Sequence, residues 1–126
     1  MTDPRNKTLR AESWKILEKY HRSGTLRSIG VSNYTLAHMK ELLSECEIVP
    51  HVIQLELHPH YQQRDLVQHC RDHNIHVQAY SSLGAAGSES PLFSSETVSE
   101  IAETVGRSPA QVLLRWGVQK GFTVMP

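Results

Sequence analysis

Hydrophobic and polar residues along this chain follow two different periods. The apolar positions Leu36, Met39, Leu42 and Leu43 have helical spacing, whereas residues 52–57 alternate between apolar and polar. Read in this way, the chain contains short β-branched strands separated by amphipathic helices. The strands are expected at residues 26–31, 52–57, 75–80 and 122–126, and the helices at about residues 10–22, 36–43, 66–74, 98–105 and 109–120.

Residues with special backbone preferences mark where these elements begin and end. Gly24, Gly106 and Gly121 are placed to end helices, because glycine readily adopts the left-handed conformation of a helix C-terminus. The stretch Ser108-Pro109-Ala110-Gln111 has the pattern of a capping box with proline at the first helical position. Residues 81–95 are rich in Gly, Ser and Ala, which predicts a surface loop, and long loops in α/β domains are often functional.

Strands separated by helices of this length predict an α/β fold with parallel strands and right-handed crossovers. Four strand and helix units in 126 residues amount to half of the about 250 residues of a (β/α)8 barrel. We therefore expect one domain over residues 1–126, a partial TIM barrel of about four parallel strands.

Charge and hydropathy exclude several kinds of partner. Thirteen Lys and Arg balance thirteen Asp and Glu, so no electrostatic argument favours nucleic acid or an anionic membrane. The apolar runs are far shorter than the about 18 residues of a membrane-spanning helix, and residues 1–7 have no apolar core of a signal peptide. These features predict a cytoplasmic protein that binds neither nucleic acid nor membrane.

Cysteine and histidine positions offer little chemistry of their own. Cys46 and Cys70 are isolated, which predicts reduced thiols without a redox role. The pairs His69/His73 and His58/His60 have spacings that can converge on zinc, but no third ligand is evident. We expect no metal site.

Four motifs stand out by their order and spacing. They are Gly24-Thr25-Leu26-Arg27-Ser28-Ile29-Gly30-Val31-Ser32-Asn33, Gln54-Leu55-Glu56-Leu57-His58-Pro59, Ala79-Tyr80-Ser81-Ser82-Leu83-Gly84 and Ser108-Pro109-Ala110-Gln111-Val112-Leu113-Leu114-Arg115-Trp116. Together they resemble the aldo-keto reductases. The resemblance extends from about Lys7 to Pro126 and implies an NADPH-binding (β/α)8 barrel that reduces aldehydes or ketones to alcohols.

The resemblance also implies a set of cofactor-binding residues at the C-terminal ends of the strands, where the sites of α/β barrels lie. Hydroxyl and amide groups both donate and accept hydrogen bonds, which suits a carboxamide, and a flat aromatic ring suits stacking on the nicotinamide. By this resemblance Ser32, Asn33 and Gln54 bind the nicotinamide carboxamide, Tyr80 stacks under its ring, and Ser81, Leu83 and Gly84 line the pyrophosphate.

Some positions of these motifs carry other expectations. Glu56 and His58 share the strand face of Gln54, but in the family this stretch is not catalytic, so both are interpreted as structural hydrogen-bonding residues. Many relatives have proline at the position of Ser82 and a polar residue at that of Ala85, which predicts weaker pyrophosphate contacts here.

The resemblance implies that the chain matches the C-terminal half of the barrel and is truncated at both ends. The family's catalytic Asp, Tyr, Lys and His have no match here, nor has the basic segment that selects NADP over NAD, so we expect no turnover by the chain alone. Two alternatives remain. Open sheet edges would suit a binding module or a self-associating half-barrel, and a third hypothesis is a product without function.

Overall fold

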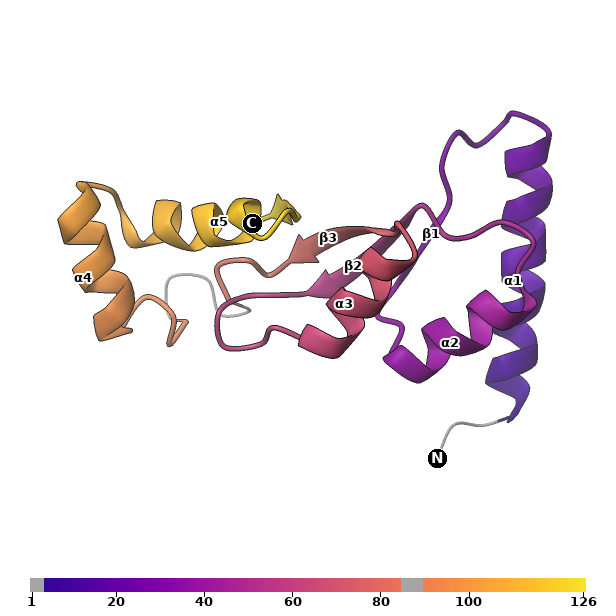
Figure 1. Cartoon of the computed structure of the whole chain (residues 1–126), viewed down its shortest axis with the longest axis horizontal. Helices are drawn as coiled ribbons and strands as arrows, with labels where there is room; N and C mark the ends of the chain where they lie inside the picture. Colours follow the sequence, from indigo (N-terminus) through magenta and orange to yellow (C-terminus); the bar gives the residue numbers. More distant parts are fainter. Residues whose placement is uncertain (1–3, 85–89) are drawn as a thin grey trace.

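The computed structural model describes residues 4–84 and 90–126 as a four-stranded parallel sheet with helices between its strands (Figure 1). The sheet has the sequential order β1-β2-β3-β4, which is that of a barrel opened along one seam. The elements in chain order are α1 (Pro4–Arg22), β1 (Gly30–Ser32), α2 (Leu36–Glu45), β2 (Val52–Glu56), α3 (Arg64–Asp72), β3 (His76–Tyr80), α4 (Glu96–Val105), α5 (Pro109–Gln119) and β4 (Thr123–Met125). The expected α/β half-barrel is confirmed.

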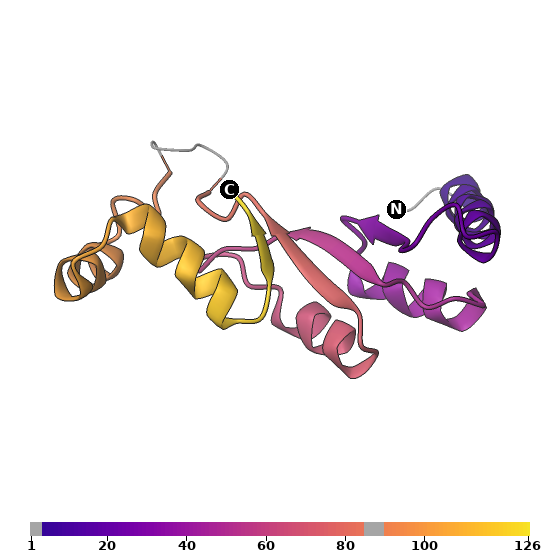
Figure 2. The ribbon, with the colours of Figure 1, turned by 90° about the horizontal axis from the view of Figure 1, so that it is seen from above.

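The helices cover one face of the sheet and leave the other face open, as Figure 2 shows for α2 and α3. Ile53 and Leu55 of β2 and Val77 and Ala79 of β3 are buried against Met39 of α2, in a core that α3 also joins. The residues between them point to the open face, so the period-two alternation is confirmed. This alternation separates an apolar, helix-covered face from a polar face.

Strands β1 and β2 approach each other so closely at position 30 that only glycine fits there. A Cβ atom on Gly30 would collide with the backbone oxygen and the Cγ1 atom of Val52 on the neighbouring strand. Strand β1 begins at Gly30, four residues later than the sequence predicted, and it includes Ser32. Residues 26–29, which were predicted to belong to this strand, lie before it. Ile29 is buried and Leu26 is half-buried, in a cluster with Trp14 of α1.

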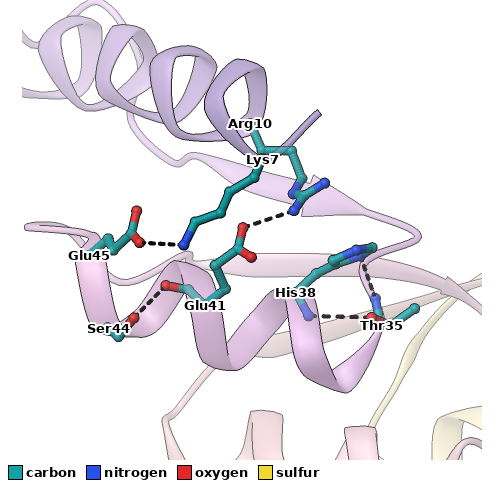
Figure 3. Close-up of polar contacts among 7 residues, drawn as sticks. All are labelled: Lys7, Arg10, Thr35, His38, Glu41, Ser44 and Glu45. Carbon is teal, nitrogen blue, oxygen red and sulfur yellow. Dashed lines mark hydrogen bonds and ion pairs between the residues drawn. The ribbon is translucent and has the colours of Figure 1, made fainter. Parts of the chain in front are cut away.

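Helix α1 begins at Pro4, six residues before the predicted start. Its first turns carry no apolar period, but ion pairs hold them to α2: Arg10 Nη2 lies 2.8 Å from Glu41 Oε1, and Lys7 Nζ lies 3.1 Å from Glu45 Oε1 (Figure 3). The hydrogen bond from Arg10 lowers the pKa of Glu41. The start of the helix thus depends on contacts between elements distant in sequence.

Thr35 and His38 form a capping box at the start of α2, also drawn in Figure 3, which the sequence reading did not anticipate because histidine replaces the usual Glu or Gln. The capping box of Ser108 and Gln111 at α5 was anticipated and is confirmed. Gly106 is confirmed as the C-cap of α4, with φ of 62°.

The ends of segment 81–95 are packed rather than lying at the surface. Ser82, Ser90 and Leu92 are buried, and Leu92 forms a cluster with Val98 of α4 and Leu113 of α5. The composition of this segment indicated a loop correctly but could not show that Ser82 and Ser90 are enclosed. Among the described residues, no helix has the length and apolar character needed to cross a membrane.

A buried carboxylate joins α1 to the connection between α2 and β2. Glu18 is only 3% exposed, and its Oε1 accepts hydrogen bonds from the backbone N–H groups of Glu47 at 2.8 Å and Ile48 at 2.9 Å. Trp14 Nε1 donates to the Ile48 oxygen beside it. Both N–H groups would lose their partner if this carboxylate were removed.

The substitution Glu18→Ala is therefore expected to lower the free energy of unfolding by about 2 to 4 kcal/mol, because two partly buried backbone donors lose their acceptor. Urea denaturation measures this change. The control Glu12→Ala removes an exposed carboxylate from the same helix and should shift the value by less than about 0.5 kcal/mol. Equal effects of the two substitutions would show that Glu18 has no special role.

Candidate functional site

The parallel register aligns polar side chains in rows across the open face of the sheet. Ser32, Gln54, Gln78 and Thr123 occupy paired positions on β1, β2, β3 and β4. One pleat nearer the C-terminal ends, Glu56, Tyr80 and Met125 are paired in the same way. The candidate site lies along this C-terminal edge, where Ser32, Asn33, Gln54, Tyr80 and Ser81 meet.

Hydrogen bonds connect the side chains of the first row. Ser32 Oγ donates to Gln54 Oε1 at 3.5 Å, and Gln54 Nε2 donates to Gln78 Oε1 at 2.9 Å. The Gln54 Nε2 group also lies 3.4 Å from Met125 Sδ, in the next row. Ser32 and Gln54, which the sequence assigned to one carboxamide, are thus in contact.

Asn33 and Tyr80 come together although 47 positions separate them in the sequence. The Tyr80 hydroxyl donates to Asn33 Oδ1 at 3.0 Å, and the Asn33 backbone N–H donates to the Gln54 oxygen at 2.9 Å. Asn33 has a φ of 57°, in the left-handed region that Asn tolerates better than most residues. This turn places the Asn33 amide over the end of β1, within reach of Tyr80.

The segment after β3 makes a tight turn at the same edge. Ser81 has a φ of 49°, which is uncommon for serine, and Gly84 has a φ of 90° with its N–H bonded to the Ser81 oxygen at 2.8 Å. A Cβ on Gly84 would collide with Ser90 Oγ, so glycine is required there. Backbone strain of this kind concentrates at functional sites.

The other positions of this segment play different parts. Leu83 is half-buried against the cluster of Leu92, Val98 and Leu113, so its side chain serves packing. Ser82 is buried, and its hydroxyl donates to the Ala79 oxygen at 3.1 Å, which satisfies this polar side chain. Ala85 lies outside the described residues.

Glu56 and His58 form a contact at the end of β2. His58 Nε2 lies 3.6 Å from Glu56 Oε1, and the backbones of His58 and Tyr61 form a short antiparallel bridge. His58 Nδ1 is buried without a hydrogen-bond partner in the described structure. The contact accords with a structural role at the barrel mouth.

His69 and Cys70 lie on α3, and His73 and Cys46 are the C-caps of α3 and α2. The rings of His69 and His73 are 4.4 Å apart, and burial lowers the pKa of His69. Burial raises the pKa of Cys70 to about 11 and also raises that of Cys46, so both thiols stay protonated at neutral pH. Among the residues described, no three His, Cys, Asp or Glu side chains are grouped as metal ligands.

The sequence reading overlooked Gln78. It lies on the open face by period-two alternation with Tyr80, and its partner position on β2 is Gln54. The signal was present in the alternation of residues 76–80, but only the register between strands brings the two amides together. The edge as a whole offers amide and hydroxyl groups and one aromatic ring, a set suited to binding a planar polar ligand.

Comparison with known proteins places this arrangement in a family. The model of the aldo/keto reductase family matches residues 1–126. Among curated proteins, the chain is 44% identical to the 9,11-endoperoxide prostaglandin H2 reductase of Trypanosoma cruzi over 115 residues, which cover 91% of this chain and 40% of the relative. It is 45% identical over 125 residues to the NAD(P)H-dependent D-xylose reductase of Scheffersomyces stipitis, covering 91% of this chain and 39% of the relative.

Solved structures agree with the sequence comparison. An aldo/keto reductase from Brucella melitensis superposes with a TM-score of 0.87 at 37% identity, over 95% of this chain and 44% of that one. A mutant of Gox0644 in complex with NADPH superposes with a TM-score of 0.83 at 38% identity, over 92% of this chain and 41% of that one.

The chain spans about 40% of the length of the curated relatives it matches. The family model covers all 126 residues of the chain. The four motifs, the sequential strand order and the polar C-terminal edge all agree with that assignment. The chain belongs to the aldo/keto reductase family.

Proposed function

We propose that this chain forms the nicotinamide-binding part of an aldo-keto reductase that reduces aldehydes or ketones to alcohols with NADPH. The observation that carries this proposal is the meeting of Ser32, Asn33, Gln54 and Tyr80 at one edge of the sheet, linked by hydrogen bonds. The printed names of two relatives support the cofactor class, since one reductase is NAD(P)H-dependent and one structure is an NADPH complex.

The donors and acceptors at this edge fit a carboxamide. Tyr80 donates to Asn33 Oδ1, which leaves the Asn33 Nδ2 group as a donor. Gln54 uses its Nε2 group toward Gln78 and Met125, so its Oε1 is the acceptor on offer. A nicotinamide carboxamide presents one carbonyl oxygen and one NH2 group, and the two side chains match these in kind.

Tyr80 contributes a flat ring in a fixed orientation. Its hydroxyl bond to Asn33 holds the ring from one end, and its backbone is paired within the sheet between Glu56 and Met125. A ring held in this way loses little freedom when a second ring stacks on it. Ser81, Leu83 and Gly84 continue the site as a turn in which small residues let the backbone approach a pyrophosphate.

When bound, NADPH supplies the hydride that reduces the carbonyl carbon. The residues of this chain fix which face of the nicotinamide is presented, because the carboxamide bonds and the stacked ring together prevent rotation. We assign no residue of this chain as the proton donor. The family's Asp, Tyr, Lys and His are taken to be supplied by segments outside the matched motifs.

Removal of the stacking ring tests the proposed binding site. We expect Tyr80→Ala to weaken NADPH binding by about 3- to 10-fold, as loss of a single aromatic pair would do. Isothermal titration measures the affinity. The control Val105→Ala removes an exposed apolar side chain from α4 and should leave the affinity unchanged. If the two variants bind equally well, the site does not lie at Tyr80.

An NADPH oxidation assay tests whether the chain catalyses the reduction or only binds the cofactor. With NADPH and a reactive aldehyde, the 126-residue chain is expected to oxidise no more cofactor than buffer does, because a hydride acceptor without a proton donor reacts slowly. The assay follows the absorbance of NADPH. Turnover above buffer that Tyr80→Ala reduces would contradict this expectation.

A second candidate function, self-association, has its own supporting observation. The outward side of α1 carries an exposed apolar stripe of Leu9, Ile16 and Tyr20, which are 58%, 56% and 48% exposed. In a right-handed crossover, a helix packs over the strand that comes before it. Helix α1 precedes β1, so it would cover a further strand paired with β1 on the side away from β2. In a second copy, β4 offers an edge of the same length and direction.

Two copies joined edge to edge would close a ring of eight parallel strands, with the stripe of α1 covered by the other copy. Sedimentation velocity should then give a dimer that Ile16→Glu converts to a monomer. Thr8→Glu adds the same charge to an exposed position beside the stripe and should leave the dimer intact. A wild-type chain that stays monomeric at every concentration would exclude self-association.

A further inference from the structure

The amide of Gln54 is held in one orientation by its neighbours in the row. An amide group has two N–H donors and one oxygen acceptor, and its two ends are not interchangeable once either end is bonded. In Gln54 the Nε2 group donates to Gln78 Oε1 at 2.9 Å and contacts Met125 Sδ at 3.4 Å. The oxygen end is thereby turned toward Ser32, whose hydroxyl donates to it at 3.5 Å.

Of these partners, Gln78 makes the short bond. Sulfur is a weak acceptor, and the bond from Ser32 has the longest distance of the three. Gln78 is half-buried on the open face, and its register with Gln54 fixes the separation of the two side chains. The orientation of Gln54 therefore depends mainly on the acceptor of Gln78.

We propose that Gln78 is a positioning residue for nicotinamide binding, which acts by fixing the Gln54 amide with its oxygen toward the site. This inference rests on the proposed function, in which Gln54 Oε1 accepts from the cofactor carboxamide. Without the acceptor at residue 78, the Gln54 amide turns over freely and presents its NH2 group in part of the population. The NH2 group of Gln54 would then face the NH2 group of the nicotinamide carboxamide. The hydrogen bond between them would not form, and leaving a half-buried polar group without a partner costs free energy.

Two variants of Gln78 separate positioning from general stabilisation. Gln78→Leu removes the acceptor and is expected to weaken NADPH binding by about 2- to 10-fold, the equivalent of one hydrogen bond. Gln78→Glu keeps an acceptor oxygen at the same reach and should restore most of the affinity. Thermal melting of each variant confirms that the compared proteins are folded.

The probe ADP-ribose identifies which part of the cofactor is affected. It carries the pyrophosphate but no nicotinamide, so its affinity should be the same for wild type and Gln78→Leu. Equal losses for NADPH and ADP-ribose would mean that Gln78 only supports the sheet, and that result would overturn the proposal. Thr123→Val, in the same row but bonded to His76 rather than Gln54, is the matched control and should change neither affinity.

A readout without any ligand distinguishes failure of this inference from failure of the proposed function. In the free protein, the side-chain NH2 resonances of Gln54 should move in Gln78→Leu and stay near their wild-type positions in Thr123→Val. Unmoved resonances in Gln78→Leu would overturn the positioning role. If they move as expected but the wild type binds no NADPH, the proposed function fails while the orientation of Gln54 by Gln78 stands, and Gln78 then has no cofactor to position.

Discussion

The register between β2 and β3 is the constraint on which the site depends. Pairing of Gln54 with Gln78 and of Glu56 with Tyr80 places four polar side chains in two rows on one face. A shift of one residue would turn Gln54 and Tyr80 into the helix-covered core and bring Ile53 and Ala79 to the open face. Burial of these apolar side chains holds the register, so the same core that stabilises the sheet also aligns the polar groups of the candidate site.

One-sided burial leaves the sheet with one polar face that the helices do not cover. Helices α2 and α3 cover the face of Ile53, Leu55 and Val77 (Figure 2). The opposite face is polar, and in a complete barrel it would point inward, where layers of side chains fill the interior. Helix α1 lies at one end of the molecule and α4 at the other, as Figure 1 shows.

Much of this architecture follows from local sequence patterns. Period-two alternation in residues 52–57 was enough to predict a strand and the face that Gln54 occupies, because burial on one side leaves a clear signal. Residues 75–80 were predicted as a strand as well, but without an assignment of its faces. The capping box at Ser108 and the glycine at 106 were likewise readable, since helix ends impose local chemical requirements. The resemblance to the family then connected the strand ends to a cofactor.

Other features depend on contacts that no single segment encodes. The early start of α1 depends on Lys7 and Arg10 meeting α2, and the later start of β1 depends on Ile29 joining the cluster around Trp14. The left-handed backbone of Ser81 has no residue signature, because serine seldom adopts it. The bond between Gln54 and Gln78 exists only through the strand register, which the sequence of either strand alone does not specify.

We propose that the polar C-terminal edge of the sheet binds the nicotinamide half of the cofactor. The most direct test is a ¹⁵N chemical-shift map of the 126-residue chain titrated with NADPH. Binding at this edge should produce the largest changes at Ser32, Asn33, Gln54 and Ser81. Changes confined to the helix layer, such as the surface between α4 and α5, would contradict it.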